Sequence, residues 1–163
     1  VLKNESIVSA FKKIISTQAI FVSRGDNSGT HLKEKKFWND IRVDLKDENN
    51  SWYREVGSGM GATLNIASAI DGYTLSDRAT WETFKNKSNL TILLEGDPKL
   101  FNQYGVIMVN PRVHSHIKYD QGQKFIDWLV SQEGQKLIST FKPNNSQLFF
   151  PNYHVKTFDP NPE

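Results

Sequence analysis

A short polar stretch at residues 21–34 carries the residue types that hold a small anion. It reads FVSRGDNSGTHLKE, so an apolar run ends in a glycine-containing turn that opens into a helix-forming segment. A helix N-terminus presents unpaired N–H donors and a partial positive charge, and both attract anions. Arg24 adds a planar, charged set of donors, and Ser23, Ser28 and Thr30 add neutral hydroxyls. The pattern predicts an oxyanion-binding loop.

Two other interpretations of this loop stay open from the residues alone. Gly25 and Gly29 could supply turn dihedrals while Ser28 or Thr30 only caps the next helix. The tripeptide RGD at 24–26 is also an adhesion motif. Such a motif needs an exposed hairpin tip, whereas this one lies between an apolar run and a helix. We therefore favour the anion site over adhesion.

A second glycine-rich turn, residues 57–62, precedes another helix-forming segment. Its letters GSGMGA match the G-x-G-x-x-A pattern of dinucleotide-binding turns, and Asp77 lies near the expected acidic position. The preceding residues, WYREV, make a poor parallel strand, which weakens the hypothesis of a nucleotide-dependent enzyme. The same glycines also fit a second anion-facing turn through Ser58, Met60 and Gly61, or plain packing of a helix against a strand.

A third polar corner follows at residues 73–80. We expect Asp77 to cap the next helix, with Thr74 and Arg78 around the anion site rather than in contact with the ligand. The ordinary alternative is a capped helix with Arg78 paired at the surface. The histidines are scattered, and no nucleophile, base and oxyanion hole come together. The sequence therefore predicts neither a metal site nor an enzyme.

The composition is typical of a well-packed domain with a small partner. The 163 residues are 37% apolar and include 10 Phe and 4 Trp, which is ample material for burial. The net charge of +2 is spread along the chain, which argues against nucleic acid as a partner. Cysteine is absent, so disulfides and thiol chemistry are excluded. No apolar run approaches the roughly 20 residues of a membrane span.

Apolar periodicity predicts alternating helices and strands, and hence an α/β fold. Helices are expected at 7–15, 30–41, 62–70, 77–86 and, as one long element, 120–141. Strands are expected at 19–22 and 73–75, with buried parallel-type strands at 90–94 and 105–109, while 52–56 is extended or helical. In the second helix Leu32, Phe37 and Trp38 are expected to face inward. The proline-rich tail from Lys142 is expected to lie over the surface.

Four blocks of the chain resemble the tungstate-binding proteins of Tup-type ABC importers, a family of bacterial extracytoplasmic solute receptors. The blocks agree with that family in residue type, spacing and order, and the resemblance runs essentially from end to end. They are FVSRGDNSGTHLKE (21–34), WYREVGSGMGATLNIASAIDGYTLSDRATW (52–81), LLEGDPKLFNQYGVIMVNP (93–111) and FIDWLVSQEGQKLI (125–138).

The resemblance implies a type II periplasmic-binding fold, in which two α/β lobes hold an oxyanion between them. Residues 1–103 would form most of lobe two with the oxyanion loop. Residues 104–163 would be the crossover strand, long helix and tail that return to lobe one. Family members are considerably longer, and their Thr- and Ser-rich first-lobe segment, which supplies the other half of the cleft, has no match here. The chain is therefore expected to begin inside the second lobe.

In the family, the block S-R-G-D-x-S-G-T-H supplies anion ligands, and it matches residues 23–31. The resemblance assigns ligand roles to Ser23, Arg24, Ser28, Gly29, Thr30 and His31, of which Arg24 comes first. Ser58, Met60 and Gly61 complete the expected ligand set. Asp26, the one nearby carboxylate, is expected to brace the loop. Ala79 departs from the glycine expected between Arg78 and Thr80.

The function implied by the resemblance is capture of tungstate or molybdate without any cofactor. Neutral donors plus one cation can hold such a dianion, whereas a protonated phosphate favours a site with a carboxylate acceptor. The receptor would work in the periplasm or another extracytoplasmic space and deliver its ligand to a membrane permease with its ATPase. Further expected partners are the remaining N-terminal part of the polypeptide or a second copy. The alternatives are a nucleotide-dependent enzyme using residues 57–62 and a binding-incompetent fragment.

Overall fold

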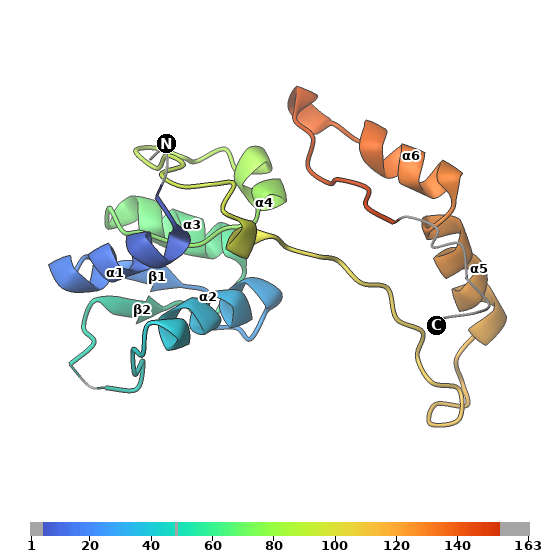
Figure 1. Ribbon diagram of the computed structural model, residues 1–163, viewed down its shortest axis with the longest axis horizontal. Helices are drawn as coiled ribbons and strands as arrows, with labels where there is room; N and C mark the ends of the chain where they lie inside the picture. Colours follow the sequence, from blue (N-terminus) through green and yellow to red (C-terminus); the bar gives the residue numbers. More distant parts are fainter. Residues whose placement is uncertain (1–4, 48, 154–163) are drawn as a thin grey trace, which may run out of the picture. The chain divides into compact units, whose positions relative to one another are not determined.

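The computed structural model of the protein describes residues 5–47 and 49–153. The chain divides into two compact units, residues 1–102 and residues 103–163 (Figure 1). The first unit contains helices α1 to α4 with strands β1 and β2, and the second contains α5 and α6. The assignment of these units to two lobes of a receptor stays a prediction.

A small parallel sheet lies in the first unit. β1 (Phe21–Ser23) pairs in parallel with β2 (Tyr53–Glu55), and on its other side makes a single parallel bridge to Tyr73. The strand expected at 73–75 is therefore reduced to one bridge. The assessment of WYREV as a poor parallel strand is wrong. Its exposed polar residues are tolerated because β2 is an edge strand, of which only one side is paired.

Four helices of the first unit confirm the helical segments predicted there, with shifted boundaries. They are α1 (Ile7–Thr17), α2 (Gly29–Asp40), α3 (Met60–Ala69) and α4 (Arg78–Thr83). Ser6, Ser28 and Asp77 cap α1, α2 and α4, since each side chain accepts the N–H of the third residue beyond it. The N-cap of α3 is Gly59, which has no side chain to cap with.

An aromatic core holds these elements together. The buried residues Ile7, Phe11 and Ile14 of α1 follow the predicted apolar face. They pack with Phe21, Phe37, Trp38 and Trp52, and the ring centroids of Phe11 and Trp38 lie 4.2 Å apart. The expectation that Leu32 faces inward is wrong, because its side chain is 57% exposed. The inward face of α2 instead carries the polar residues His31 and Glu34.

The first unit is also closed by a contact between distant parts of the sequence. Asp97 Oδ2 accepts the N–H of Ile7, the first residue of α1, at 2.7 Å. Asp97 also caps the short 3-10 helix Pro98–Leu100 through the N–H of Lys99. These two backbone hydrogen bonds, from Ile7 first, lower the pKa of the Asp97 carboxyl.

In the second unit, α5 (Tyr119–Leu129) and α6 (Gln132–Thr140) replace the single long helix expected at 120–141, so that prediction is wrong. Ser131 separates them, because its hydroxyl donates to the Trp128 carbonyl at 2.7 Å and accepts the Gly134 N–H at 3.2 Å. Gly134 permits the tight junction, since a Cβ there would collide with the Trp128 carbonyl oxygen. The tail contains the 3-10 helix Pro143–Asn145, and its residues 154–163 lie outside the described residues.

The buried strands expected at 90–94 and 105–109 are not formed, which corrects that prediction. Leu93 is exposed, and Ile107 is 89% exposed. A strand needs a neighbouring strand to pair its N–H and C=O groups, and the described residues place none beside either segment. No helix within 5–47 or 49–153 is long and apolar enough to span a membrane.

Candidate oxyanion site

Two loops that follow the strands are hydrogen-bonded to each other. Loop 23–31 follows β1 and leads to α2, and turn 57–61 follows β2 and leads to α3. The Val56 N–H donates to the Ser23 carbonyl at 3.0 Å, and the Ser58 N–H donates to the Arg24 carbonyl at 3.1 Å. Because the strands are parallel, both helices begin at the same sheet edge, where open α/β sheets bind ligands.

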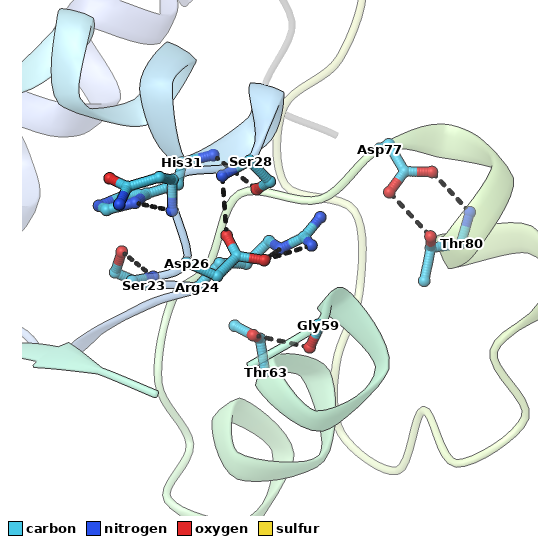
Figure 2. Close-up of polar contacts among 11 residues, drawn as sticks. Ser23, Arg24, Asp26, Ser28, His31, Gly59, Thr63, Asp77 and Thr80 are labelled. Carbon is cyan, nitrogen blue, oxygen red and sulfur yellow. Dashed lines mark hydrogen bonds and ion pairs between the residues drawn. The ribbon is translucent and has the colours of Figure 1, made fainter. Parts of the chain in front are cut away.

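Arg24 and Asp26 form an ion pair inside loop 23–31, drawn between Ser28 and Gly59 in the view of Figure 2. Arg24 Nε and Nη2 donate to Asp26 Oδ2 at 3.1 and 2.6 Å, and Asp26 Oδ1 accepts the Ser28 N–H at 3.1 Å. Hydrogen bonds from Ser28 first, and then from Arg24, lower the pKa of Asp26 to about 2. Asp26 thus braces the loop. Nη1 of Arg24 makes no hydrogen bond within the described residues and keeps its donors available.

The first turn of α2 offers donors that no described residue accepts. The Ser28 hydroxyl accepts the His31 N–H at 3.3 Å and so serves as the helix cap. The backbone N–H groups of Gly29 and Thr30, and the Thr30 hydroxyl, have no acceptor among the residues described. These groups lie at the positive end of the α2 dipole.

The first turn of α3 is still more open, because no side chain caps it. The N–H groups of Met60 and Gly61 have no acceptor in the described part of the chain. Met60 is buried, so the group that would serve as a ligand is its backbone N–H and not its side chain. The Thr63 hydroxyl donates to the Gly59 carbonyl at 3.1 Å and tightens this turn (Figure 2). Ser58 is exposed beside it.

The third corner matches the ordinary alternative of a capped helix with a surface ion pair. The Asp77 carboxylate accepts both the N–H and the hydroxyl of Thr80, each at 2.8 Å. Arg78 pairs with Glu95, Nη2 to Oε2 at 2.5 Å. The Thr74 hydroxyl donates to the Val22 carbonyl at 2.8 Å and fastens this segment to β1.

Two expected ligand residues are buried in contacts of the loop itself. The Ser23 hydroxyl accepts the Gly25 N–H at 3.2 Å, and Ser23 is fully buried. His31 Nδ1 accepts the Asn27 N–H at 2.9 Å, so this ring nitrogen is used within the loop. Its buried Nε2 makes no hydrogen bond and lies 3.5 Å from Glu55 Oε1. Ligand roles for Ser23 and His31 stay predictions.

Behind the loop lies a buried acid that the sequence analysis missed. Glu34 on α2 is 1% exposed, and its Oε1 accepts the Tyr53 hydroxyl at 2.7 Å and the Trp38 Nε1–H at 3.3 Å. Burial raises the pKa of Glu34 to about 7, although hydrogen bonds from Tyr53, Ser23 and Trp38 oppose the shift. The signal was its spacing, since Glu34 shares one helical face with Trp38 and His31.

The arrangement can hold a small anion by neutral donors and one cation. Two helix N-termini, the Thr30 hydroxyl and the Arg24 guanidinium border one edge of the sheet. Groups that could bind a cation are scarce, since the described residues contain no cluster of three or more His, Cys, Asp or Glu side chains placed to hold a metal ion. The α/β fold and this arrangement of donors suit a small anionic solute.

The comparison with protein families agrees. The family described as PBP superfamily domain matches residues 2–133, and the chain belongs to that superfamily. It is 38% identical over 148 residues to the tungstate-binding protein TupA of Peptoclostridium acidaminophilum, covering 90% of this chain and 51% of the relative. It is 37% identical over 151 residues to TupA of Campylobacter jejuni, covering 90% and 55%. The resemblance seen in the sequence is confirmed.

Solved structures give the same result. The tungstate-binding protein TupA from Desulfovibrio alaskensis G20 matches with a TM-score of 0.76 at 41% identity, covering 94% of this chain and 62% of that one. The tungstate ABC transporter structure from Geobacter sulfurreducens matches with a TM-score of 0.73 at 43% identity, covering 85% and 58%. These relatives are named for tungstate binding and transport, which agrees with the expectation that the chain is not an enzyme. The chain spans about half the length of the curated relatives it matches.

Proposed function

We propose that this chain is part of an extracytoplasmic solute receptor that captures tungstate or molybdate and passes it to the permease and ATPase of an ABC importer. The observation that carries the proposal is the paired helix start beside Arg24. The backbone N–H groups of Gly29, Thr30, Met60 and Gly61 lack acceptors among the described residues. The tungstate-binding relatives narrow the class of anion.

The state of Asp26 supports tungstate over phosphate. Phosphate can retain a proton near neutral pH, and a receptor for it gains from a carboxylate that accepts this proton. Asp26 is the carboxylate within loop 23–31, and its oxygens are occupied by Arg24 and the Ser28 N–H. A dianion without such a proton needs no acceptor. Molybdate has the same charge and shape as tungstate, so both are included.

We further propose that residues 1–103 act as most of lobe two and residues 104–163 as the segment that returns to lobe one. Lining from another part of the polypeptide would then complete the cleft. The support is the division of the chain into units at residue 102 and the roughly half-length match to the relatives.

Titration calorimetry on the full-length polypeptide that carries residues 1–163 tests the proposal. We expect heat from tungstate or molybdate and weak or no binding of sulfate and phosphate. Arg24→Ala should weaken tungstate binding by about one to two decades, because a charge-assisted contact contributes about 1.5–3 kcal/mol. Arg24→Lys should recover only part of the tungstate affinity, since lysine keeps the charge but lacks the planar set of donors of the guanidinium.

Arg54→Ala is the matched control, because it removes the same charge from an exposed residue of β2 whose side chain makes no hydrogen bond or ion pair to loop 23–31 among the described residues. It should leave tungstate affinity unchanged. Unchanged affinity in Arg24→Ala would remove Arg24 from the site. Thermal protection by NAD or ATP with none from tungstate would contradict the proposal and favour the nucleotide-dependent enzyme.

A further inference from the structure

Glu34 is a buried acid with no cation to neutralise it. No ion pair among the described residues includes it, and its carboxylate is held by neutral donors. An unpaired carboxylate in a dry interior is costly, so the group favours its neutral, protonated form. Glu34 supplies none of the proposed ligand groups.

The elements around Glu34 act in both directions: their hydrogen bonds favour the charged form, whereas burial and the charge of Glu55 favour the neutral form and outweigh them. From β2, the Tyr53 hydroxyl donates to Oε1, and the charge of Glu55 disfavours a second negative charge. From α2, the Trp38 indole donates to Oε1. His31, on the same helix, has its Nε2 3.5 Å from Glu55 Oε1. From β1 comes the Ser23 hydroxyl, a neutral group. The cluster of residues around Glu34 therefore includes a second acid, Glu55, and no described cation pairs with Glu34.

The same cluster is attached to loop 23–31 through Ser23. The Ser23 hydroxyl, which lies by the Glu34 carboxyl, accepts the Gly25 N–H at 3.2 Å. The Ser23 carbonyl accepts the Val56 N–H, and the next carbonyl, of Arg24, accepts the Ser58 N–H. Ser23 and its neighbour Arg24 thus link Glu34 to both loops of the candidate site.

We propose that Glu34 is a proton-coupled positioning residue for the oxyanion site, so that anion binding at loop 23–31 and protonation of Glu34 favour each other. This inference rests on the proposed function of the site. A charged Glu34 would place a negative charge behind a loop that must receive a dianion, in a region where water screens little. A neutral Glu34 removes that repulsion and can donate a hydrogen bond.

The direction of the effect follows from linkage. If protonation of Glu34 strengthens anion binding, anion binding must raise the affinity of Glu34 for its proton by the same factor. Burial already raises the pKa of Glu34 to about 7, so the change in anion affinity falls near neutral pH. Anion affinity is full below that pH and declines as the pH rises through it.

The test is tungstate calorimetry on the full-length polypeptide between about pH 6 and pH 8.5. We expect the dissociation constant of the wild type to increase by roughly tenfold across this range, within the usual span of coupling between two sites. Titrations in two buffers of different ionisation enthalpy should show net proton uptake on binding near pH 7. Glu34→Gln, which imitates the neutral acid, should bind as the wild type does at low pH and show neither effect.

Two further variants separate Glu34 from other titrating groups. His31→Asn keeps an acceptor for the Asn27 N–H, and Glu133→Gln removes an exposed carboxylate from α6. Both variants should keep the pH dependence of the tungstate dissociation constant. Loss of that dependence in His31→Asn, its retention in Glu34→Gln, or a pH-independent wild type would overturn the inference while leaving tungstate capture intact.

Absence of tungstate binding at every pH would overturn the proposed function and this inference together. If Glu34→Gln does not fold, the wild-type buffer experiment still decides the matter, because binding without proton uptake contradicts the coupling. A merely structural role for Glu34 would lower affinity in the variant equally at all pH values and would produce no proton uptake.

Discussion

Two carboxyl groups of the first unit have opposite surroundings and opposite protonation behaviour. Asp26 sits at the loop surface, where hydrogen bonds from Ser28 and Arg24 lower its pKa to about 2. Glu34 lies behind that loop, where burial raises its pKa to about 7. The half-buried Asp26 therefore stays charged and fixes the arginine, whereas the fully buried Glu34 exchanges its proton near neutrality.

At the residue scale, Glu34 should also mark the pH dependence of stability. Its folded pKa, about 7, lies above the ordinary value of 4.5. The folded state therefore binds more protons between these values, and this contribution to stability is present below 4.5 and is lost as pH rises to 7. Glu34→Gln lacks the loss. Relative to the wild type, its free energy of unfolding should rise by about 3 kcal/mol across this window.

Urea denaturation of both proteins at about pH 5 and about pH 8 measures this difference. The comparison between variants cancels the carboxylates that the two proteins share. Parallel pH profiles for Glu34→Gln and the wild type would show that Glu34 ionises in the folded protein as it does in the unfolded chain.

At the scale of elements, the turn at Gly25 holds β1, β2 and the start of α2 in place. Gly25 has a φ of +61°, and a Cβ there would lie 2.9 Å from Glu55 Cβ and 3.2 Å from Gly57 N. Gly25→Ala should therefore destabilise the fold by about 1–3 kcal/mol and weaken tungstate binding. Gly29→Ala is the stability control, because space around Gly29 is open. Thermal melting and calorimetry measure both effects, and equal melting temperatures would contradict the prediction.

The sequence predicted the elements whose signals are local. The apolar face of α1, the glycine turn before α2 and the Asp77 cap each depend on residues a few positions apart. The prediction that Leu32 lies on the inner face of α2 was wrong. His31 and Glu34 lie on that face instead, because they contact Glu55 and Tyr53 of β2. Contacts between distant segments leave little trace in periodicity.

The missed break and the missing strands have different physical causes. The long helix is divided by Ser131, whose hydroxyl competes for backbone partners at a position where Gly134 allows a close turn. Residues 90–94 and 105–109 have the apolar content of strands, but pairing needs a neighbour that no local pattern supplies. The loop of the candidate site was predictable because a turn, an arginine and a helix start are adjacent in sequence.

At the scale of the whole molecule, the second unit leaves its apolar side chains uncovered. No residue of α5 is buried, and within α6 only Gly134 is. The exposed apolar residues of this unit include Ile107, Phe125, Leu137 and Phe141. Amphipathic helices gain stability by burying such faces, so this unit needs a cover that its own described residues do not provide.

We therefore expect residues 1–163, prepared alone, to bind oxyanions weakly or not at all and to self-associate or retain other parts of the polypeptide. Size-exclusion chromatography with light scattering and mass spectrometry measures the assembly, and tungstate calorimetry measures binding. The full-length polypeptide is the control for both. A clean 18.7 kDa monomer that binds tungstate as tightly as the full-length control would contradict the prediction.

The hydrogen bond between Asp97 and Ile7 brings the two ends of a long stretch of the chain together. It joins two points 90 positions apart, near the first and last described residues of the first unit. Closely spaced ends are what allow a domain to be spliced into another protein or circularly permuted. The stretch from Ile7 to Asp97 therefore has the closely spaced ends that a transplantable domain requires.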